Sequence, residues 1–152
     1  MSMDELLAEI RSFDGVLELA PAEGGPFPEL AWGDHFFYYS PDGEVPQGEQ
    51  PYATIVTKDY PDEPSSGLDP DGRWRVNIHV GRQEFTRLLG ADPRDEPGNV
   101  DHTVADTVLP HPTYRTQGWV SVVNPGQATW GLVLDLLRGA HEAARRRAQR
   151  RG

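Results

Sequence analysis

Histidine and carboxylate side chains are the first groups whose chemistry could define a function, because the chain contains no cysteine. Imidazole and carboxylate groups are then the remaining protein ligands for zinc or iron. No two histidines have the H-x-x-x-H or H-E-x-x-H spacing that places two ligands on one helix face. The pattern therefore favours scattered loop or surface histidines, and a metal-dependent enzyme is the alternative. Its candidate ligands are His35, His102 and His111, with His79, Asp34 and Asp101 as further members.

A second set of polar residues lies on one strand-like segment. Residues 74–80 alternate between apolar and polar side chains, which predicts that Arg75, Asn77 and His79 share one face of a strand. Lys58, the single lysine of the chain, ends another β-branched segment. If the two strands are neighbours, these four side chains form a ligand-binding patch that attracts a small anionic group. An ordinary solvated face is the competing interpretation.

Other motifs that carry chemistry are missing from the sequence. It contains no G-x-S-x-G elbow, no P-loop and no dinucleotide-binding fingerprint. Acidic residues crowd two loops, 59–63 and 92–96, where paired carboxylates could act as acid and base if their environments separated their pKa values. In proline-rich loops such acids are more typical of solubilising charge. We therefore predict no catalytic residue and no cofactor, and favour a non-enzymatic role over an enzyme.

Arginine is concentrated at the C-terminus, within residues 145–151, while the chain as a whole has a formal net charge of −10. Nucleic-acid binding through this arginine cluster is a further alternative. The acidic remainder of the chain argues against it, because it repels a phosphate backbone. Basic residues late in a helix also complement the helix dipole. A contact with an acidic patch on the same or another chain is an equally good interpretation.

The elements that position these residues follow from apolar periodicity and turn signals. Ser2 and Glu5 have capping-box spacing and begin a helix over residues 2–13. A last helix, from about residue 127 to near residue 147, has an apolar stripe. With strands predicted between these helices, the fold class is α+β, an antiparallel sheet covered on one face by the N- and C-terminal helices. The expected strands are 16–19, 32–39, 52–58, 74–80 and 118–124, with a short helix ending at Gly90.

Length and composition limit the remaining classes. The 152 residues are typical of one domain, which we place at residues 1–147 with a basic tail at 148–152. The absence of cysteine excludes a disulfide framework and is typical of a reducing compartment. No apolar run approaches the roughly 18 residues that span a bilayer, and the acidic N-terminus lacks the basic start of a signal peptide. We therefore expect a cytoplasmic protein that does not bind membranes.

Several segments together resemble a known family. The helix ending at Asp14-Gly15-Val16, Trp32-Gly33 with Phe36-Phe37, and the strand around Arg75 before the Phe85 helix resemble the MmcQ/YjbR-like family. Residues 51–60, 109–112 and 118–120 look like an uncharacterised bacterial domain family close to it. The resemblance implies a frataxin-like outline of the fold. For the broad family it also suggests DNA binding, but the acidic net charge of this chain does not fit that function. It implies no catalytic residues.

These observations combine into one functional prediction. We expect a non-enzymatic cytosolic binding module that uses the open face of its sheet, with Lys58, Arg75, Asn77 and His79 as contacts. Its partner would be a small anionic ligand or another protein, and the module would be a monomer or a homodimer. Metal-dependent catalysis and nucleic-acid binding remain the alternatives.

Overall fold

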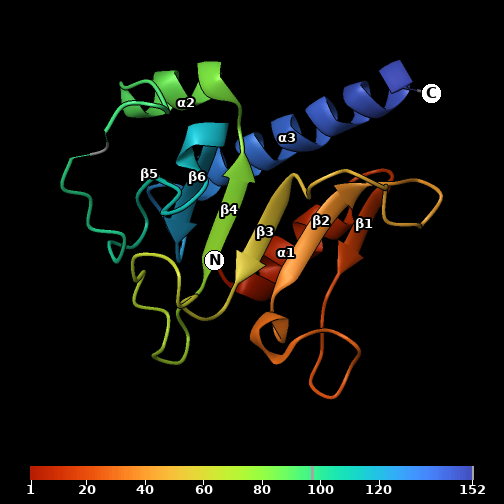
Figure 1. The fold of residues 1–152 in the computed structure, drawn as a ribbon, viewed down its shortest axis with the longest axis horizontal. Coiled ribbons are helices and arrows are strands. Elements are labelled where there is room, and N and C mark those ends of the chain that lie inside the picture. Colours follow the sequence, from red (N-terminus) through yellow and green to blue (C-terminus); the bar gives the residue numbers. More distant parts are fainter. Residues whose placement is uncertain (97, 152) are drawn as a thin grey trace.

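Six short strands form a single antiparallel sheet in the computed structural model, which describes residues 1–96 and 98–151 (Figure 1). The strand order across the sheet is β1-β2-β3-β4-β6-β5. This arrangement confirms the predicted α+β class. The strands are β1 (Val16–Leu19), β2 (His35–Tyr39), β3 (Ala53–Val56), β4 (Arg75–His79), β5 (Leu109–Pro110) and β6 (Trp119–Val123).

The helices follow the predicted order along the chain. Ser2 caps the first helix, and its hydroxyl oxygen accepts a hydrogen bond from the N–H of Glu5 at 3.1 Å. The second helix ends at Gly90, which adopts the left-handed conformation that glycine tolerates best. The α-helices are α1 (Met3–Arg11), α2 (Arg82–Leu89) and α3 (Trp130–Arg151), with 3₁₀ turns η1 (Glu29–Ala31) and η2 (Arg115–Gln117).

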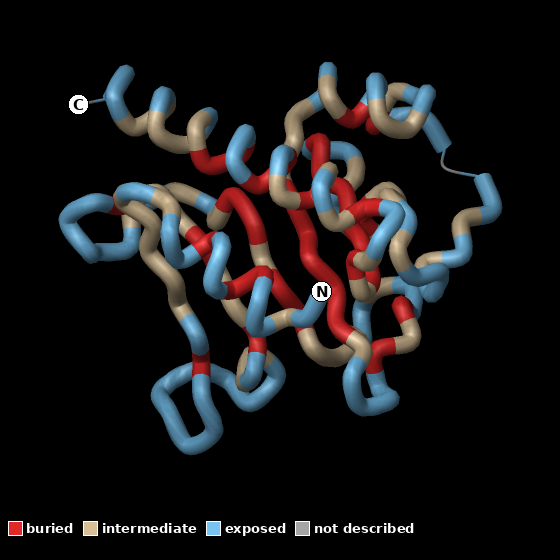
Figure 2. Tube along the Cα trace, turned by 180° about the vertical axis from the view of Figure 1, so that it is seen from behind, coloured by how far each residue is buried: buried red, intermediate tan, exposed pale blue. Residues whose placement is uncertain are grey.

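The core lies between one face of the sheet and the helices. The register pairs Ile55 with Val76 and Ile78 with Val120, so that their fully buried side chains share this face. Leu6 of α1 and Leu137 of α3 pack in the same apolar cluster. Burial of one such side chain contributes roughly 1.5–3 kcal/mol to stability. Figure 2 shows the buried segments running along the central strands and the inward side of α3.

His141 of α3 is a core residue whose role the sequence pattern did not indicate. Its Nε2 donates to the carbonyl oxygen of Asp14 at 2.8 Å, and its Nδ1 accepts from the hydroxyl of Tyr52 at 2.9 Å. The ring also packs against the aromatic rings of Phe13 and Tyr39. These contacts join α3 to the end of α1 and to the sheet.

Several boundaries differ from the sequence-based prediction. β2 begins at His35 rather than at Trp32, because the preceding residues form η1 and a turn. Residues 103–110, for which no strand is predicted above, supply the two residues of β5 and an isolated bridge at Ala105. α3 continues to Arg151, so residues 148–151 of the expected basic tail extend the helix, while residue 152 lies outside the described residues. None of the helices in residues 1–96 and 98–151 combines the length and apolar character of a membrane span.

The turn that leads into α3 is held by a carboxylate from a distant loop. Asp106 accepts hydrogen bonds from the N–H groups of Gly126 and Ala128 and from the hydroxyl of Thr129. These residues belong to the turn immediately before α3, which begins at Trp130. The Thr129 hydroxyl and the N–H groups lower the pKa of Asp106 to about 2. The ionised carboxylate therefore stabilises the start of α3.

This cap predicts a pH-dependent effect. Because the pKa of Asp106 is lower in the folded chain, its contribution is present above the ordinary aspartate pKa of about 3.9. The contribution is lost as the pH falls toward about 2. Asp106→Asn should lower the melting temperature at neutral pH, and the difference from wild type should shrink in acid. Thermal denaturation followed by circular dichroism measures both quantities.

Asp135→Asn is the matched control, because Asp135 lies on α3 with a side chain that is 77% exposed. It should leave the melting temperature near the wild-type value across the same pH range. An Asp106→Asn variant as stable as Asp135→Asn at neutral pH would contradict the proposed cap.

Candidate ligand pocket

A pocket of about 420 Å³ lies on the face of the sheet that α1 and α3 leave uncovered. Its floor comes from the central strands β3 and β4, and its walls come from β2, β6 and three loops. This volume falls within the range of roughly 300–1,000 Å³ that is usual for small-molecule sites. The lining residues are Phe36, Tyr38, Gln50, Pro51, Thr54, Val56, Tyr60, Glu63, Arg75, Asn77, His111, Tyr114 and Trp119.

Strand alternation explains which side chains reach this face. Phe37 of β2 is buried in the core, so its neighbours Phe36 and Tyr38 point to the opposite side and line the pocket. Thr54 of β3 pairs with Asn77 of β4 in the sheet register, so their side chains lie on the same face. The predicted polar face of β4 is therefore present, with aromatic side chains beside it.

The guanidinium of Arg75 forms the centre of a buried hydrogen-bond network. It donates to the side-chain oxygens of Asn77, Ser66 and Glu63, each at 2.8 Å. The side chains of Arg75 and Glu63 are only 3% and 9% exposed. Loops thus cover a residue that the sequence pattern placed on an open, wet face. Glu63, which we had assigned to solubilising loop charge, is the ion-pair partner of Arg75.

Three further hydrogen bonds extend this network across the sheet and between loops. The Nδ2 group of Asn77 donates to the hydroxyl oxygen of Thr54 at 2.9 Å, and the hydroxyl of Ser121 donates to the Asn77 carbonyl at 2.8 Å. Thr113 donates its hydroxyl to the second carboxylate oxygen of Glu63 at 2.8 Å. The floor of the pocket is therefore fixed by β3, β4 and β6 together.

His111 is a neutral hydrogen-bonding group in the pocket wall. Its Nδ1 accepts from the backbone N–H groups of Thr113 and Tyr114, both at 3.0 Å, which places the ring proton on Nε2. Burial, followed by the nearby charges of Arg75 and His102, lowers the pKa of His111 to about 3. Within the residues that the structure describes, Nε2 has no protein partner, so it is a donor that a ligand could use.

Lys58 is directed to a different cluster, centred on the fully buried carboxylate of Asp34. The ammonium group of Lys58 donates to the carbonyl of Trp32 at 2.6 Å and to Asp34 at 3.2 Å. Thr57 and Tyr60 also donate to Asp34. Burial raises the pKa of Tyr60 above its ordinary value, and the neighbouring Asp34 adds to this effect. Lys58 is not a lining residue, so the structure does not join it to the patch on β4.

His79 also lies outside this pocket, at the end of β4. Its Nε2 donates to the carbonyl of Gln117 at 2.9 Å, and its ring packs near that of Trp119. Burial lowers the pKa of His79 below its ordinary value. Of the four predicted contacts, the structure therefore brings only Arg75 and Asn77 into the pocket.

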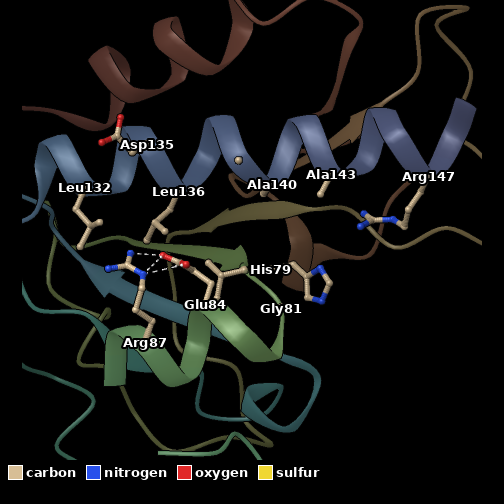
Figure 3. A pocket seen from close by; sticks show the side chains of 12 residues that line it. His79, Gly81, Glu84, Arg87, Leu132, Asp135, Leu136, Ala140, Ala143 and Arg147 are labelled. Carbon is tan, nitrogen blue, oxygen red and sulfur yellow. Dashed lines mark hydrogen bonds and ion pairs between the residues drawn. The ribbon is translucent and has the colours of Figure 1, made fainter. Parts of the chain in front are cut away.

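His79 instead borders a groove of about 430 Å³ between α2 and α3 (Figure 3). Leu132 and Leu136 of α3 face the ion pair of Arg87 and Glu84 across this groove. The Arg87 side chain is 63% exposed, so the charges that rim the groove are largely solvated. The groove lacks the buried polar network of the pocket, which makes the pocket the stronger candidate site.

The predicted metal ligands do not gather at one point. In residues 1–96 and 98–151, no three His, Asp or Glu side chains are arranged to hold a metal ion. His35 pairs with Glu18 at 2.6 Å, on another part of the sheet. The Nδ1 atom of His102 is buried and has no hydrogen-bond partner within residues 1–96 and 98–151. Burial also lowers the pKa of His102. The carboxylate of Asp101 accepts hydrogen bonds from the N–H and the hydroxyl of Thr103.

Three of the C-terminal arginines have acidic partners within the chain. Arg145 and Arg146 pair with Glu142 on α3, and Arg151 pairs with Glu49 in the loop after β2. These side chains are largely exposed, so each pair contributes little to stability. Contact with an acidic group of the same chain was one of the interpretations of this cluster.

Sequence reasoning missed most of the residues that form the pocket wall. The alternation in β2 could have assigned Phe36 and Tyr38 to the face opposite the core. No pattern in the sequence indicated that the loops carrying Tyr60, Glu63 and His111 fold over β4. These loops have no periodicity, and their position depends on long-range hydrogen bonds.

The fold and the pocket define an α+β fold in which terminal helices cover one face of an antiparallel sheet and loops border a pocket on the other. Over residues 1–152, the chain belongs to the family described as "Family of unknown function (DUF6194)". This match agrees with the expected uncharacterised domain family and shows no link to the MmcQ/YjbR-like family. No curated protein and no solved structure matches the chain significantly.

Proposed function

We propose that this protein is a binding module for a small molecule, and that the pocket over β3 and β4 is its binding site. The observation that carries the proposal is the combination of a 420 Å³ cavity with a buried polar floor and aromatic walls. Ligand sites typically join apolar and aromatic walls to a few fixed polar groups. Arg75, Asn77 and His111 are such groups, because other hydrogen bonds already hold them in position.

The proposed role is binding rather than catalysis, which follows from the protonation states in the pocket. The ionised groups that line it, Arg75 and Glu63, are paired with one another. His111 has a pKa of about 3 and is neutral near pH 7, where it is a poor general base. The arrangement can orient a ligand, and it offers no activated nucleophile.

Protein-observed NMR with a panel of small fragments, planar and non-planar and of either charge, tests this proposal. The chain has four tryptophans, of which Trp119 lines the pocket. Fragments that occupy the pocket should shift the indole N–H signal of Trp119 in ¹⁵N-correlated spectra more than the other three indole signals. The Trp119→Phe variant assigns that signal by its loss.

Tyr114→Ala provides the mutational arm of the test. Tyr114 stands at the pocket wall with half of its surface exposed, so its truncation should change stability little. Loss of its ring contact should weaken fragment binding by about 3–10-fold, since an aromatic pair is worth about 0.5–1.5 kcal/mol. Phe27→Ala is the matched control, because Phe27 is similarly exposed and is not a lining residue. Absence of any Trp119 shift, or equal affinity of Tyr114→Ala and wild type, would reject the proposal.

A further inference from the structure

We infer that the ligand of this pocket is an uncharged planar heterocycle that carries hydrogen-bond acceptors. This inference rests on the proposed binding function and adds the chemical class of the ligand. It departs from the small anionic ligand that the sequence pattern favoured, because the structure places the relevant cations in internal ion pairs.

The charge of the pocket is the first argument. Arg75 and Glu63 are the charged residues among those that line it, and they form an ion pair at 2.8 Å. Lys58, the other predicted cation, is paired with Asp34 outside the pocket. An anionic ligand would have to displace the Glu63 carboxylate from Arg75 and leave a carboxylate unpaired in a buried position, which is unfavourable. A neutral ligand leaves this pair intact.

The free hydrogen-bonding groups are the second argument. The Nε2–H of His111 has no partner in the described chain, since the ring is anchored through Nδ1. The hydroxyl oxygen of Thr54 accepts from Asn77, and within residues 1–96 and 98–151 its proton is donated to no protein group. Both groups are therefore donors. A ligand that satisfies them needs acceptors such as a ring nitrogen or a carbonyl oxygen.

The shape of the walls is the third argument. β2 and β6 flank the central strands on opposite sides, so Phe36 and Tyr38 stand across the floor from Trp119. Tyr114 adds a further ring at the wall. Aromatic side chains on both sides favour a flat ring that can stack against them. The polar floor between the walls then contacts the edge of that ring.

Quinoline-3-carboxamide and quinoline-3-carboxylate form a probe pair with the same ring and different charge. Each is titrated into the full-length protein at neutral pH while the Trp119 indole signal is followed. We expect the carboxamide to bind at least about fivefold more tightly, because the carboxylate must lose its hydration without gaining a free cation. Equal or tighter binding of the carboxylate would overturn the inference.

The outcomes separate this inference from the proposed function. If neither quinoline binds while charged or non-planar fragments of the panel shift Trp119, the ligand class is wrong and the binding function stands. If no fragment of either charge binds, both are wrong.

Glu63→Gln supplies a variant in which the preference should reverse. Glutamine keeps an oxygen that can accept from Arg75 but removes the negative charge, so the guanidinium becomes available to an anion. The carboxylate should then gain about tenfold in affinity relative to the carboxamide. Glu142→Gln removes an equal charge from an ion pair on α3 and should leave the wild-type preference unchanged. An unchanged preference in Glu63→Gln would overturn the inference. If this variant fails to fold, the comparison of the two quinolines in the wild-type protein decides the inference alone.

Discussion

Replacing Arg75 with alanine is expected to lower the free energy of unfolding by about 3–5 kcal/mol. The side chain is almost fully buried and donates to Asn77, Ser66 and Glu63. Its removal leaves the Glu63 carboxylate buried without its cation, and an uncompensated buried charge is the costly part of such a change. Urea denaturation followed by tryptophan fluorescence measures the loss.

Arg87→Ala is the matched control for this prediction. Arg87 pairs with Glu84 on the surface of α2, and its side chain is 63% exposed. Exposed pairs contribute about 0–1 kcal/mol, so this variant should remain close to wild type. Adding Glu63→Gln to Arg75→Ala should recover part of the lost stability, because the unpaired charge is removed as well. A loss for Arg75→Ala no larger than for Arg87→Ala would contradict the buried network.

Replacing Gly118 with alanine is expected to cost about 2–5 kcal/mol of stability. Gly118 has φ +85°, where an L-residue costs about 1–2 kcal/mol. An added Cβ would also lie 2.8 Å from the backbone atoms Cα and C of Gly81, which are not free to move as a side chain is. Such overpacking adds about 1–3 kcal/mol. The close approach exists because the carbonyl of Gly118 accepts the N–H groups of Val80 and Gly81.

Gly43→Ala separates the two causes. Gly43 has a similar φ of +80°, and no atom lies within 4 Å of the position of an added Cβ. This control should show only the conformational cost of about 1–2 kcal/mol. Chemical denaturation measures the free energy of unfolding of both variants. The difference between their losses reports the close contact between the backbones at Gly118 and Gly81. Equal losses in the two variants would show that this contact does not constrain the fold.

The elements of the fold could be predicted from the sequence because their signals are local. The Ser2 cap, the alternation through Arg75 and Asn77, and the glycine that ends α2 all depend on residues a few positions apart. The antiparallel sheet and its helix-covered face followed from these local signals together. Half of the predicted contact set, Arg75 and Asn77, lies in the pocket for the same reason.

The remainder of the site required tertiary structure. Lys58 continues from the end of β3 toward Asp34, because a buried carboxylate needs the donors that Thr57, Lys58 and Tyr60 supply. The side chain of a residue beyond a strand end does not follow the alternation of that strand. His79 has the predicted alternation, but the end of β4 lies beside Gln117 rather than beside the pocket.

The sequence by itself determined the three helices, every strand except β5, and the face of the sheet on which Arg75 and Asn77 lie, since hydrophobic periodicity specifies these locally. Only the tertiary structure decided that this face is covered and that its charge is neutralised. Glu63 reaches Arg75 from a loop without periodic pattern, and the partner of a loop residue depends on how the whole chain packs. The change from an open basic patch to a neutral pocket bordered by loops therefore follows from long-range contacts that no local pattern encodes.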